Sequence, residues 1–539
     1  MKKIKYILLL AIIIFVASCS EDFLDRKPYD QLVTANYYKT SEEIGQALTA
    51  TYDMLQRDGW NAFIIISEWM SDNCTGGGGI TDGPGQNEYD EFYCVDRDMS
   101  SGHWTNYYNG IKRANIVIEK IDNPKWKDSE KTLRAQYLSE AYFLRAFFYF
   151  RLALLFENIP IVDKVIAPED AYISQASPDE LYEFIAKDLE FAIKNFPSVP
   201  FSQMKPEDYG RATKWAAEAL LARVWLFYTG YYKKDALGDL TKSAVTTYVD
   251  DIINFGGFKL LDNYEDLWLY ASLTNPLYSE YHSENIFSIK YTYQGVGKWG
   301  QNDGSRWQVM IAPRNKSYPP YGKGWALAPV NKSIYDAYDS TDTRRDGTIV
   351  NWDKLLGPNV YDISDQRHPT GYGWRKYCPL ATNTSQTDVE SKGGNFMIDN
   401  YQDEYVIRYS DVLLMAAELH LGDGTGKDVQ YYNMVRNRAY KNNVTPKTNI
   451  TKQDIMQERR LEFALEGLRY WDLLRQGLDV AENAIESNST QYPVDFPKED
   501  PDFRGFLKIP ETQVALSNGT IKQNIFWEKP NSLTNRLSK

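Results

Sequence analysis

The sequence predicts a mainly α-helical protein: a tetratricopeptide-like scaffold of antiparallel helical pairs that carries an irregular insertion of loops and short strands. Three observations support this. Apolar residues recur every three or four positions through several segments before residue 255 and again after residue 401. These segments follow one another at the regular spacing of helical repeats. Between about 256 and 400 the periodicity fades, Gly, Pro, Asn and Tyr increase, and β-like runs such as Asn285–Tyr293 appear.

The expected helices are bounded by ordinary start and stop signals. Ser177, Pro178 and two following acids form a helix N-terminus, because proline suits the first helical position and acids suit the first turn. Pro160 ends the helix before it. In chain order, the periodicity predicts helices at 41–55, from 104, at 138–155, from 178, and at 213–228, 240–255, 405–421 and 429–440.

The chain has no low-complexity linker, so we predict one large domain over residues 19–539. Its helical scaffold would occupy about 40–255 and 401–539. The irregular insertion would occupy about 256–400 and is laid over the scaffold.

The first residues predict a lipoprotein signal peptide. Lys2, Lys3 and Lys5 precede an apolar run at 6–16 that is too short to be a comfortable membrane span. The run ends in Val16-Ala17-Ser18-Cys19, in which small residues lead to a cysteine. We therefore expect residues 1–18 to be removed and Cys19 to be lipidated, since a multiply acylated cysteine anchors a protein stably to a membrane. A true transmembrane anchor is the less favoured alternative.

Composition excludes some partners. The net charge of −13 and the isoelectric point near 5.1 argue against nucleic acid, because such a surface repels phosphates. The 40 tyrosines and 14 tryptophans favour either a large aromatic core or flat, amphipathic ligand surfaces.

Without Cys19, three cysteines remain, so at least one thiol is unpaired. Cys74 and Cys94 bracket a glycine-rich loop, and whether they form a disulfide stays open.

No enzyme motif stands out. His103, His282, His368 and His420 have no metal-ligand spacing, and neither His-Glu-x-x-His nor Gly-x-Ser-x-Gly occurs. The run Gly76–Gly79 lacks the Lys-Ser/Thr ending of a phosphate loop. A glycosidase-like carboxylate pair stays open, because only distance in space defines it. We predict no enzyme activity and no cofactor, and the sequence neither predicts nor excludes a structural calcium ion.

Binding without catalysis suits the irregular loops. An aromatic ring covers the apolar face of a sugar, while Asp, Asn and Arg bond its hydroxyls. Glycines flank both Trp325 and Trp374, and could let these rings stand clear of the backbone. For any single aromatic, packing beneath its loop explains the pattern equally well. The candidate ligand-binding residues are Asp72, Asn73, Tyr93, Trp325, Tyr372, Trp374 and Arg375.

A charge-rich segment near the C-terminus, residues 457–475, contains two helices and is called here the signature segment. Thr451 with Asp454 predicts a capping box ahead of it, and Gly467 predicts a left-handed residue that closes the first helix. Glu458 and Glu462 stand four residues apart and repel each other unless an arginine lies between them. The charges fit an active-site clamp or an ion network that locks neighbouring helices, and we favour the network.

The signature segment resembles a motif of SusD/RagB-family lipoproteins, E-R-R-L-E-x-x-x-E-G-x-R-x-W-D-L-x-R. It is met by Glu458, Arg459, Arg460, Leu461, Glu462, Glu466, Gly467, Arg469, Trp471, Asp472, Leu473 and Arg475. Leu468 stands where many members carry histidine. Further matches extend along nearly the whole mature chain: Glu140–Phe156 with Pro160, residues 210–214, 408–414 and Ile509-Pro510.

The resemblance implies four tetratricopeptide-like helical pairs and a lipid-anchored protein on the outer face of the outer membrane, with Ser20-Glu21-Asp22 as the acidic export signal. It implies capture of a glycan, which a TonB-dependent SusC-like transporter then takes inward. Two rivals remain: an oligopeptide-capturing lid of the RagB type and, less favoured, a glycoside hydrolase.

Overall fold

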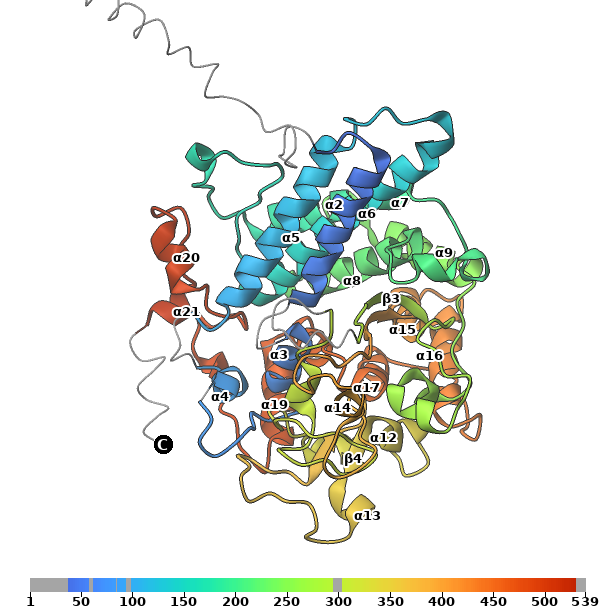
Figure 1. Ribbon diagram of the computed structural model, residues 1–539, viewed down its shortest axis with the longest axis vertical. Helices are drawn as coiled ribbons and strands as arrows, with labels where there is room; N and C mark the ends of the chain where they lie inside the picture. The colour runs from blue at the N-terminus through green and yellow to red at the C-terminus, as the bar shows by residue number, and fades with distance from the viewer. Residues whose placement is uncertain (1–36, 58–61, 84, 94–97, 294–302, 530–539) are drawn as a thin grey trace, which may run out of the picture.

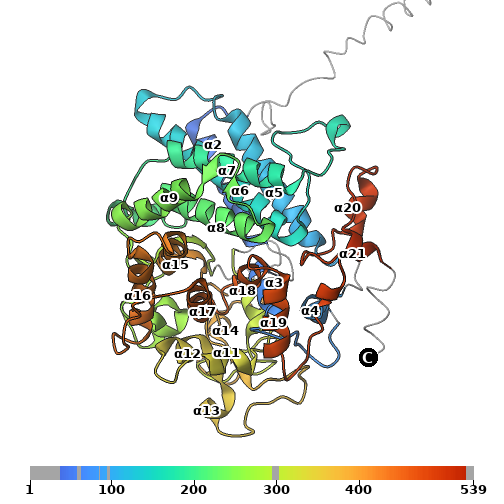
Figure 2. The same ribbon diagram turned by 180° about the vertical axis from the view of Figure 1, so that it is seen from behind.

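The computed structural model describes residues 37–57, 62–83, 85–93, 98–293 and 303–529. The predicted signal peptide, the export signal, Cys19 and Cys94 lie outside these ranges. Within them, the chain forms two stacked layers, an upper layer of long helices and a lower one of short helices, strands and loops (Figures 1 and 2). No helix in the described ranges is both long and apolar enough to cross a membrane.

Six long helices build the upper layer, each packed against the next in the chain. They are α2 (Ser41–Tyr52), α5 (Ser101–Lys120), α6 (Lys131–Phe156), α7 (Pro178–Asn195), α8 (Lys214–Tyr232) and α9 (Lys242–Phe255). The row continues through α15 (Tyr409–His420), which packs against α9, and α16 (Lys427–Ala439). This succession of helix pairs confirms the predicted mainly α, tetratricopeptide-like scaffold.

Local signals set the ends of these helices as expected. Ser177 and Glu180 form a reciprocal capping box at the start of α7, with Pro178 in the first turn. Thr213 accepts a hydrogen bond from the Ala216 amide and so caps α8. Because these caps satisfy the free amides of the first turn, the helix starts are fixed locally before any tertiary contact forms.

The lower layer holds most of the other elements. Among its helices are α3 (Phe63–Trp69), α17 (Lys452–Phe463), α18 (Arg469–Leu474) and α19 (Leu478–Asn488), of which α17 and α19 are the longest. The remaining short helices are α4 (Gly85–Asp90), α10 (Gln308–Ile311), α11 (Lys332–Ala337), α12 (Thr343–Thr348), α13 (Trp352–Leu356), α14 (Asp388–Ser391), α20 (Glu511–Leu516) and α21 (Ile525–Glu528).

Three small antiparallel sheets, each of two strands, occur in the described residues. They pair β1 (Ala236–Leu237) with β2 (Leu240–Thr241), β3 (Asn285–Ile289) with β6 (Glu404–Arg408), and β4 (Ile349–Asn351) with β5 (Tyr372–Trp374). The second pairing joins the irregular region to the C-terminal helices.

Three expected helices have clearly different bounds in the structure. The helix predicted at 138–155 begins earlier, since α6 spans Lys131–Phe156. The predicted helix 405–421 begins with a strand, because Tyr405–Arg408 pair with β3 and only Tyr409–His420 are helical. The predicted helix 41–55 ends at Tyr52 and continues as the 3₁₀ turn η2 (Asp53–Arg57). Tyr405, Val406 and Ile407 suit a buried strand as well as a helix, so periodicity alone does not distinguish the two.

The hydrophobic core is one large cluster that runs through both layers, with a small second cluster around Trp352. Trp268, Trp307, Trp352 and Trp374, all from the irregular region, are buried. Most of the tryptophans of that region therefore serve packing, and Trp325, which is half-buried, is the exception among the described ones.

Candidate ligand-binding site

The signature segment is buried and its charges are matched, as the ion-network interpretation predicts. Glu462 is 0% exposed and lies among three arginines from three other elements: Arg344 at 3.2 Å, Arg408 at 2.9 Å and Arg438 at 2.5 Å. Burial alone would raise the pKa of Glu462, but the three guanidinium groups hold it well below its ordinary value. Arg344 also contacts Glu458 at 2.6 Å, so an arginine separates the two glutamates.

Further pairs extend this network between α15, α17 and α18. Arg459 bridges Asp411 at 2.6 Å and Asp472 at 2.8 Å, and Arg475 holds Glu418 through two bonds of 2.8 and 2.9 Å. The Thr451 capping box is present. Gly467 is left-handed with φ 75°, but α17 already ends at Phe463. The glycine instead permits close approach to α3, because a Cβ at this position would lie 2.7 Å from the Cα of Ile64.

Asp72 and Asn73 lie in this interior and not in an exposed loop, so their predicted part in ligand binding gains no support from their positions. Both are 0% exposed. Asp72 accepts from Arg469 at 2.7 Å and pairs with Arg460 at 2.8 Å. Burial would raise the pKa of Asp72, and the two arginines lower it below its usual range. Asn73 donates to Glu68 at 2.9 Å, so its amide is also occupied.

The glycine-rich loop and the Trp325 loop lie side by side, although nearly 250 residues separate them in the sequence. Four backbone hydrogen bonds join them: Asn331 to Asn73, Thr75 to Pro329, Gly77 to Leu327 and Gly78 to Ala326, at 2.8 to 3.0 Å. A Cβ on Gly77 would lie 2.3 Å from Pro329 Cδ and 2.4 Å from Ala326 O. The glycines therefore permit close backbone packing, and the loop is not a phosphate cradle.

Trp325 and Trp374 have different surroundings, despite their similar glycine flanks. Trp374 is 1% exposed and its Nε1 donates to Ala328 O at 2.8 Å. The expectation that its ring stands clear of the backbone is wrong, because strand β5 places it beneath the 327–330 segment. Trp325 is half-buried against the core. Its part in ligand binding stays a prediction.

The other sequence-predicted residues occupy separate positions. Tyr372 is half-buried beside Tyr335, with ring centroids 4.9 Å apart. The guanidinium of Arg375 lies 3.9 Å from the Tyr270 ring centroid and 3.7 Å from Glu265, so it is already stacked and paired. Tyr93 is 6% exposed. Burial raises its pKa to about 12. Of these three, Tyr372 is joined to the loop that carries Trp325, because its carbonyl accepts from the Val330 amide at 3.4 Å.

Two arginines fasten three loops around Trp325, and we call residues 75–83, 322–331 and 360–368 the Trp325 loops. Arg314 contacts Asp82 at 3.0 Å, Asp365 at 2.8 Å and Trp325 O at 3.4 Å. Arg367 donates to the carbonyls of Gly83 and Asp82 at 3.1 and 2.7 Å. Ile80 and Ile363 on these loops are 60% and 50% exposed. The Trp325 loops therefore carry an aromatic ring, exposed apolar side chains and charged groups that are already paired.

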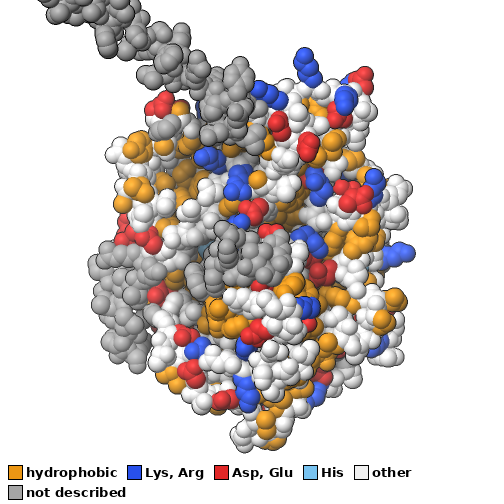
Figure 3. Space-filling model, viewed as in Figure 1, with side chains coloured by type: hydrophobic (Ala, Val, Ile, Leu, Met, Phe, Trp, Pro, Cys, Tyr) orange, Lys and Arg blue, Asp and Glu red, His pale blue; other side chains and the backbone are white. Residues whose placement is uncertain are grey.

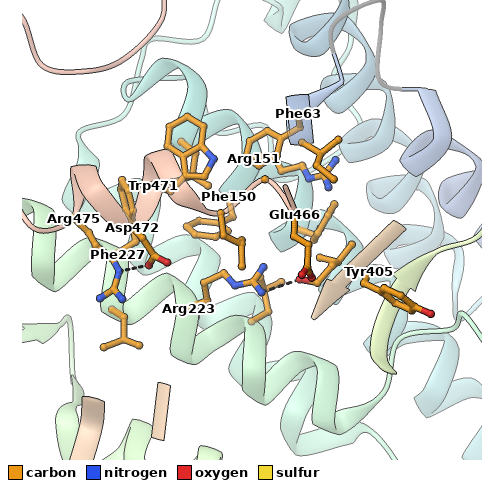
Figure 4. A pocket seen from close by; sticks show the side chains of 18 of the residues that line it. Phe63, Phe150, Arg151, Arg223, Phe227, Tyr405, Glu466, Trp471, Asp472 and Arg475 are labelled. Carbon is orange, nitrogen blue, oxygen red and sulfur yellow. Dashed lines mark hydrogen bonds and ion pairs between the residues drawn. The ribbon is translucent and has the colours of Figure 1, made fainter. Parts of the chain in front are cut away.

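An internal cavity of about 60 Å³ lies between the two layers (Figure 4). Phe63, Phe150, Phe227 and Trp471 line it together with charged residues of the signature segment and of α6, α8 and β6. Those charges already have partners: Arg151 pairs with Glu404, Arg223 with Asp411, and Arg475 with Glu418 and Asp472. A small, mostly apolar space walled by matched ions offers little to a sugar, so we do not place the ligand there.

A wider groove of about 570 Å³ opens at the boundary of the layers. One wall is α2 with η2, another is the 209–211 turn, and the third is the end of β3 through Lys290 with Asp303. Sequence reasoning missed these residues. The only signal was the stretch 210–214 among the family-like matches, since the groove forms from segments far apart in the chain.

The described residues contain no group of three or more His, Cys, Asp or Glu side chains placed to hold a metal ion. Cys74 and Cys378 are free and buried, and Cys94 lies outside the described residues. Figure 3 shows charges of both signs scattered over the front face, without one dominant basic patch.

Comparison with known proteins bears directly on the family. A family model described as "Starch-binding associating with outer membrane" matches residues 22–226, and the SusD family model matches residues 227–527. A SusD-like protein of Bacteroides ovatus is 25% identical, over 95% of this chain and 92% of its own length. A SusD-like protein of Formosa agariphila is 27% identical, over 88% of this chain and 92% of its own.

Solved structures agree with the fold. Surface glycan-binding protein A from Bacteroides thetaiotaomicron, in complex with laminarihexaose, superposes with a TM-score of 0.76 at 27% identity, covering 90% of this chain and 100% of that one. Surface glycan-binding protein A from Bacteroides fluxus gives 0.76 at 25% identity, covering 90% and 99%. The SusD family model alone matches more than half of the sequence, and the fold agrees over nearly all of it. The chain therefore belongs to the SusD family.

Proposed function

We propose that this protein is a cell-surface glycan-binding lipoprotein that captures an oligosaccharide without cleaving it. The observation that carries the proposal is the match over 90% of the chain to a glycan-binding protein solved with laminarihexaose. A sequence identity of 27% over that length makes a shared ligand class the best-supported inference, whereas the particular glycan varies with local side chains.

The Trp325 loops supply a physical basis for binding. Trp325 is half-buried and packs against the core, so its ring is already held and little conformational entropy would be lost if a sugar stacked on its accessible part. Arg314 and Arg367 hold the surrounding loops in place before the ligand arrives. Individually weak stacking and hydrogen bonds suit a protein that must release its ligand to a transporter.

Anchoring and delivery extend the proposal. Lipidation at Cys19 would hold the protein on the outer face of the outer membrane. Its partner there would be a SusC-like TonB-dependent transporter, with this protein as the lid that passes glycan inward. A pull-down of the lipidated protein from outer membranes, followed by mass spectrometry, tests this step. Recovery without a transporter would contradict it.

The first experiment is an affinity-gel screen across plant, fungal and host polysaccharides, followed by calorimetry with oligosaccharides of the best ligand. Trp325→Ala should lower the affinity by about tenfold or more, since one lost stacking contact is worth about 0.5–1.5 kcal/mol beyond its buried area. Trp325→Phe should keep part of the affinity. Tyr172→Ala is a matched control, because Tyr172 is 56% exposed on the distant 161–177 connection.

The rivals give different results in the same assays. Affinity for oligopeptides and none for glycans would favour a RagB-type peptide lid. Release of reducing sugar that one carboxylate substitution abolishes would favour a glycoside hydrolase. The absence of binding to every glycan tested would contradict the proposal.

A further inference from the structure

We propose that the groove between α2, the 209–211 turn and β3 is a second oligosaccharide-binding site, separate from the Trp325 loops. The inference rests on the proposed glycan-binding function, but it assigns a new place on the molecule. The groove's volume of about 570 Å³ lies within the range of about 300–1,000 Å³ typical of small-ligand sites. None of its lining residues belongs to the Trp325 loops.

The wall formed by the upper layer is rigid. Tyr52 donates its hydroxyl to Glu140 at 2.7 Å and accepts from the Ala212 amide at 2.8 Å. Arg211 holds the same carboxylate through Nε at 3.1 Å and Nη2 at 2.8 Å. Glu140 is fully buried, so this chain of bonds fixes both Tyr52 and the 209–211 turn.

The opposite wall is fixed just as firmly. The Lys290 ammonium pairs with buried Asp403 and lies 3.9 Å from the Tyr209 ring centroid. A Cβ on Gly210, where φ is 92°, would lie 2.5 Å from Lys290 Cγ, so only glycine lets the lysine rest against this turn. Gln56 donates to Lys290 O at 2.5 Å and ties η2 to the end of β3. A ligand would therefore meet a groove that is already shaped, and binding would order few side chains.

Polar groups at the groove keep unused hydrogen-bonding capacity. Two polar atoms have no hydrogen-bond partner among the described residues: Nη1 of Arg211 and Oε1 of Gln56. The other nitrogens of these groups, Nε and Nη2 of Arg211 and Nε2 of Gln56, already donate hydrogen bonds. Asp53 contacts Arg57 at 2.9 Å and Arg113 at 3.3 Å, so its charge is balanced while its oxygens can accept further bonds. The groove lining thus holds both a free donor and free acceptors.

This arrangement favours a neutral, hydroxyl-rich ligand. Arg211 and Lys290 are each neutralised by a buried carboxylate, so neither side chain offers an unmatched positive charge to a phosphate or sulfate. Sugar hydroxyls both donate and accept, and therefore suit mixed polar walls. In Figure 1, α2 lies on the front of the upper layer with β3 just below it, so the groove lies along the boundary of the two layers.

A peptide is the alternative occupant. β3 pairs with β6 along one edge, and the backbone at Ser288–Lys290 lines the groove, so an extended peptide could add a strand there. However, Gln56 already occupies the carbonyl of Lys290, which leaves a short edge for such pairing. The glycan is the occupant that the side chains favour.

The test fills the groove from its rim. Ala50 lies on the exposed side of α2 and lines the groove, so Ala50→Trp should block it without touching the buried ion pairs. Thr49→Trp is a second blocking variant. Glu42→Trp is the matched control, because Glu42 is exposed on the same helix outside the groove. Thermal melting checks that each variant is folded.

The measurement is calorimetric titration with a neutral oligosaccharide found in the glycan screen. Wild-type protein should bind two copies and Ala50→Trp one. Trp325→Ala should bind one copy with unchanged affinity and the other about tenfold or more weakly, and the double variant should keep only the weakened binding. Unchanged stoichiometry and affinity in both blocking variants, with binding lost in Trp325→Ala, would overturn the second site and leave the proposed function intact. Failure of wild-type protein to bind any glycan would overturn both. If wild-type protein binds a peptide and Ala50→Trp does not, the occupant of the groove is a peptide and not a glycan.

Discussion

The signature segment and the groove both contain arginines paired with buried carboxylates, but they use their remaining hydrogen-bonding capacity differently. Arg408 in the signature network directs Nε, Nη1 and Nη2 to Glu466, Glu284, Ser410 and Glu462, all inside the protein. Arg211, which lines the groove, holds Glu140 with two nitrogens, and its Nη1 has no partner among the described residues. Density of charge therefore does not indicate a ligand site, whereas donors left unused beside an open volume do.

The largest effect should follow from removing one charge from the network. Glu462→Gln leaves Arg344, Arg408 and Arg438 buried around a neutral amide, and the free energy of unfolding should fall by about 3–5 kcal/mol. Urea unfolding measures the change. Glu207→Gln, on the exposed surface, should change stability by less than about 0.5 kcal/mol. A small loss of unfolding free energy in Glu462→Gln would show that the network does not hold these elements together.

Trp325 and Trp374, both in the irregular region, test the contrast between core and ligand surface. Trp374→Ala should cost about 3–5 kcal/mol of unfolding free energy, because its ring and its bond to Ala328 O are buried. Trp325→Ala should cost only about 1 kcal/mol, since its ring is half-exposed. Thermal melts of the two variants, run side by side, give the comparison. Equal losses would place Trp325 in the core and remove it from the proposed ligand surface.

The pH dependence of stability tests a single pair of the network. Burial opposes ionisation of Glu418, but Arg475 lowers its pKa from 4.5 to about 2. Because the folded pKa is depressed, this stabilisation is complete above about pH 4.5 and is lost as the pH falls through about 2. The difference corresponds to about 3 kcal/mol. Wild-type protein should lose this increment on acidification, whereas Glu418→Gln should lack it throughout. If the curves of unfolding free energy against pH are parallel for wild-type protein and Glu418→Gln, the stabilisation does not come from the Glu418–Arg475 pair.

The helical scaffold could be predicted from sequence because its signals are local. The caps at Ser177 and Thr451 involve residues only three positions apart, and the apolar periodicity of α5 to α9 reports which face is buried. The switch from strand to helix at Tyr409 could not be predicted, since it depends on pairing with β3, more than 100 residues earlier.

The candidate site was harder to predict, because its residues come from distant segments. Asp72 and Trp374 look like loop residues in the sequence, yet Arg460, Arg469 and Ala328 bury them. The groove unites Tyr52, Arg211 and Lys290 from three segments, and no local pattern marks this proximity.

The sequence by itself determined the family, the helical scaffold and the matched charges of the signature segment, because short-range patterns of apolar and charged residues specify all three. The tertiary structure decided which aromatic rings are core, why the glycines at 76–79 are needed, and where an open groove remains. Exposure is a property of contacts between segments, and a contact such as that of Gly77 with Pro329 exists only after the chain has folded.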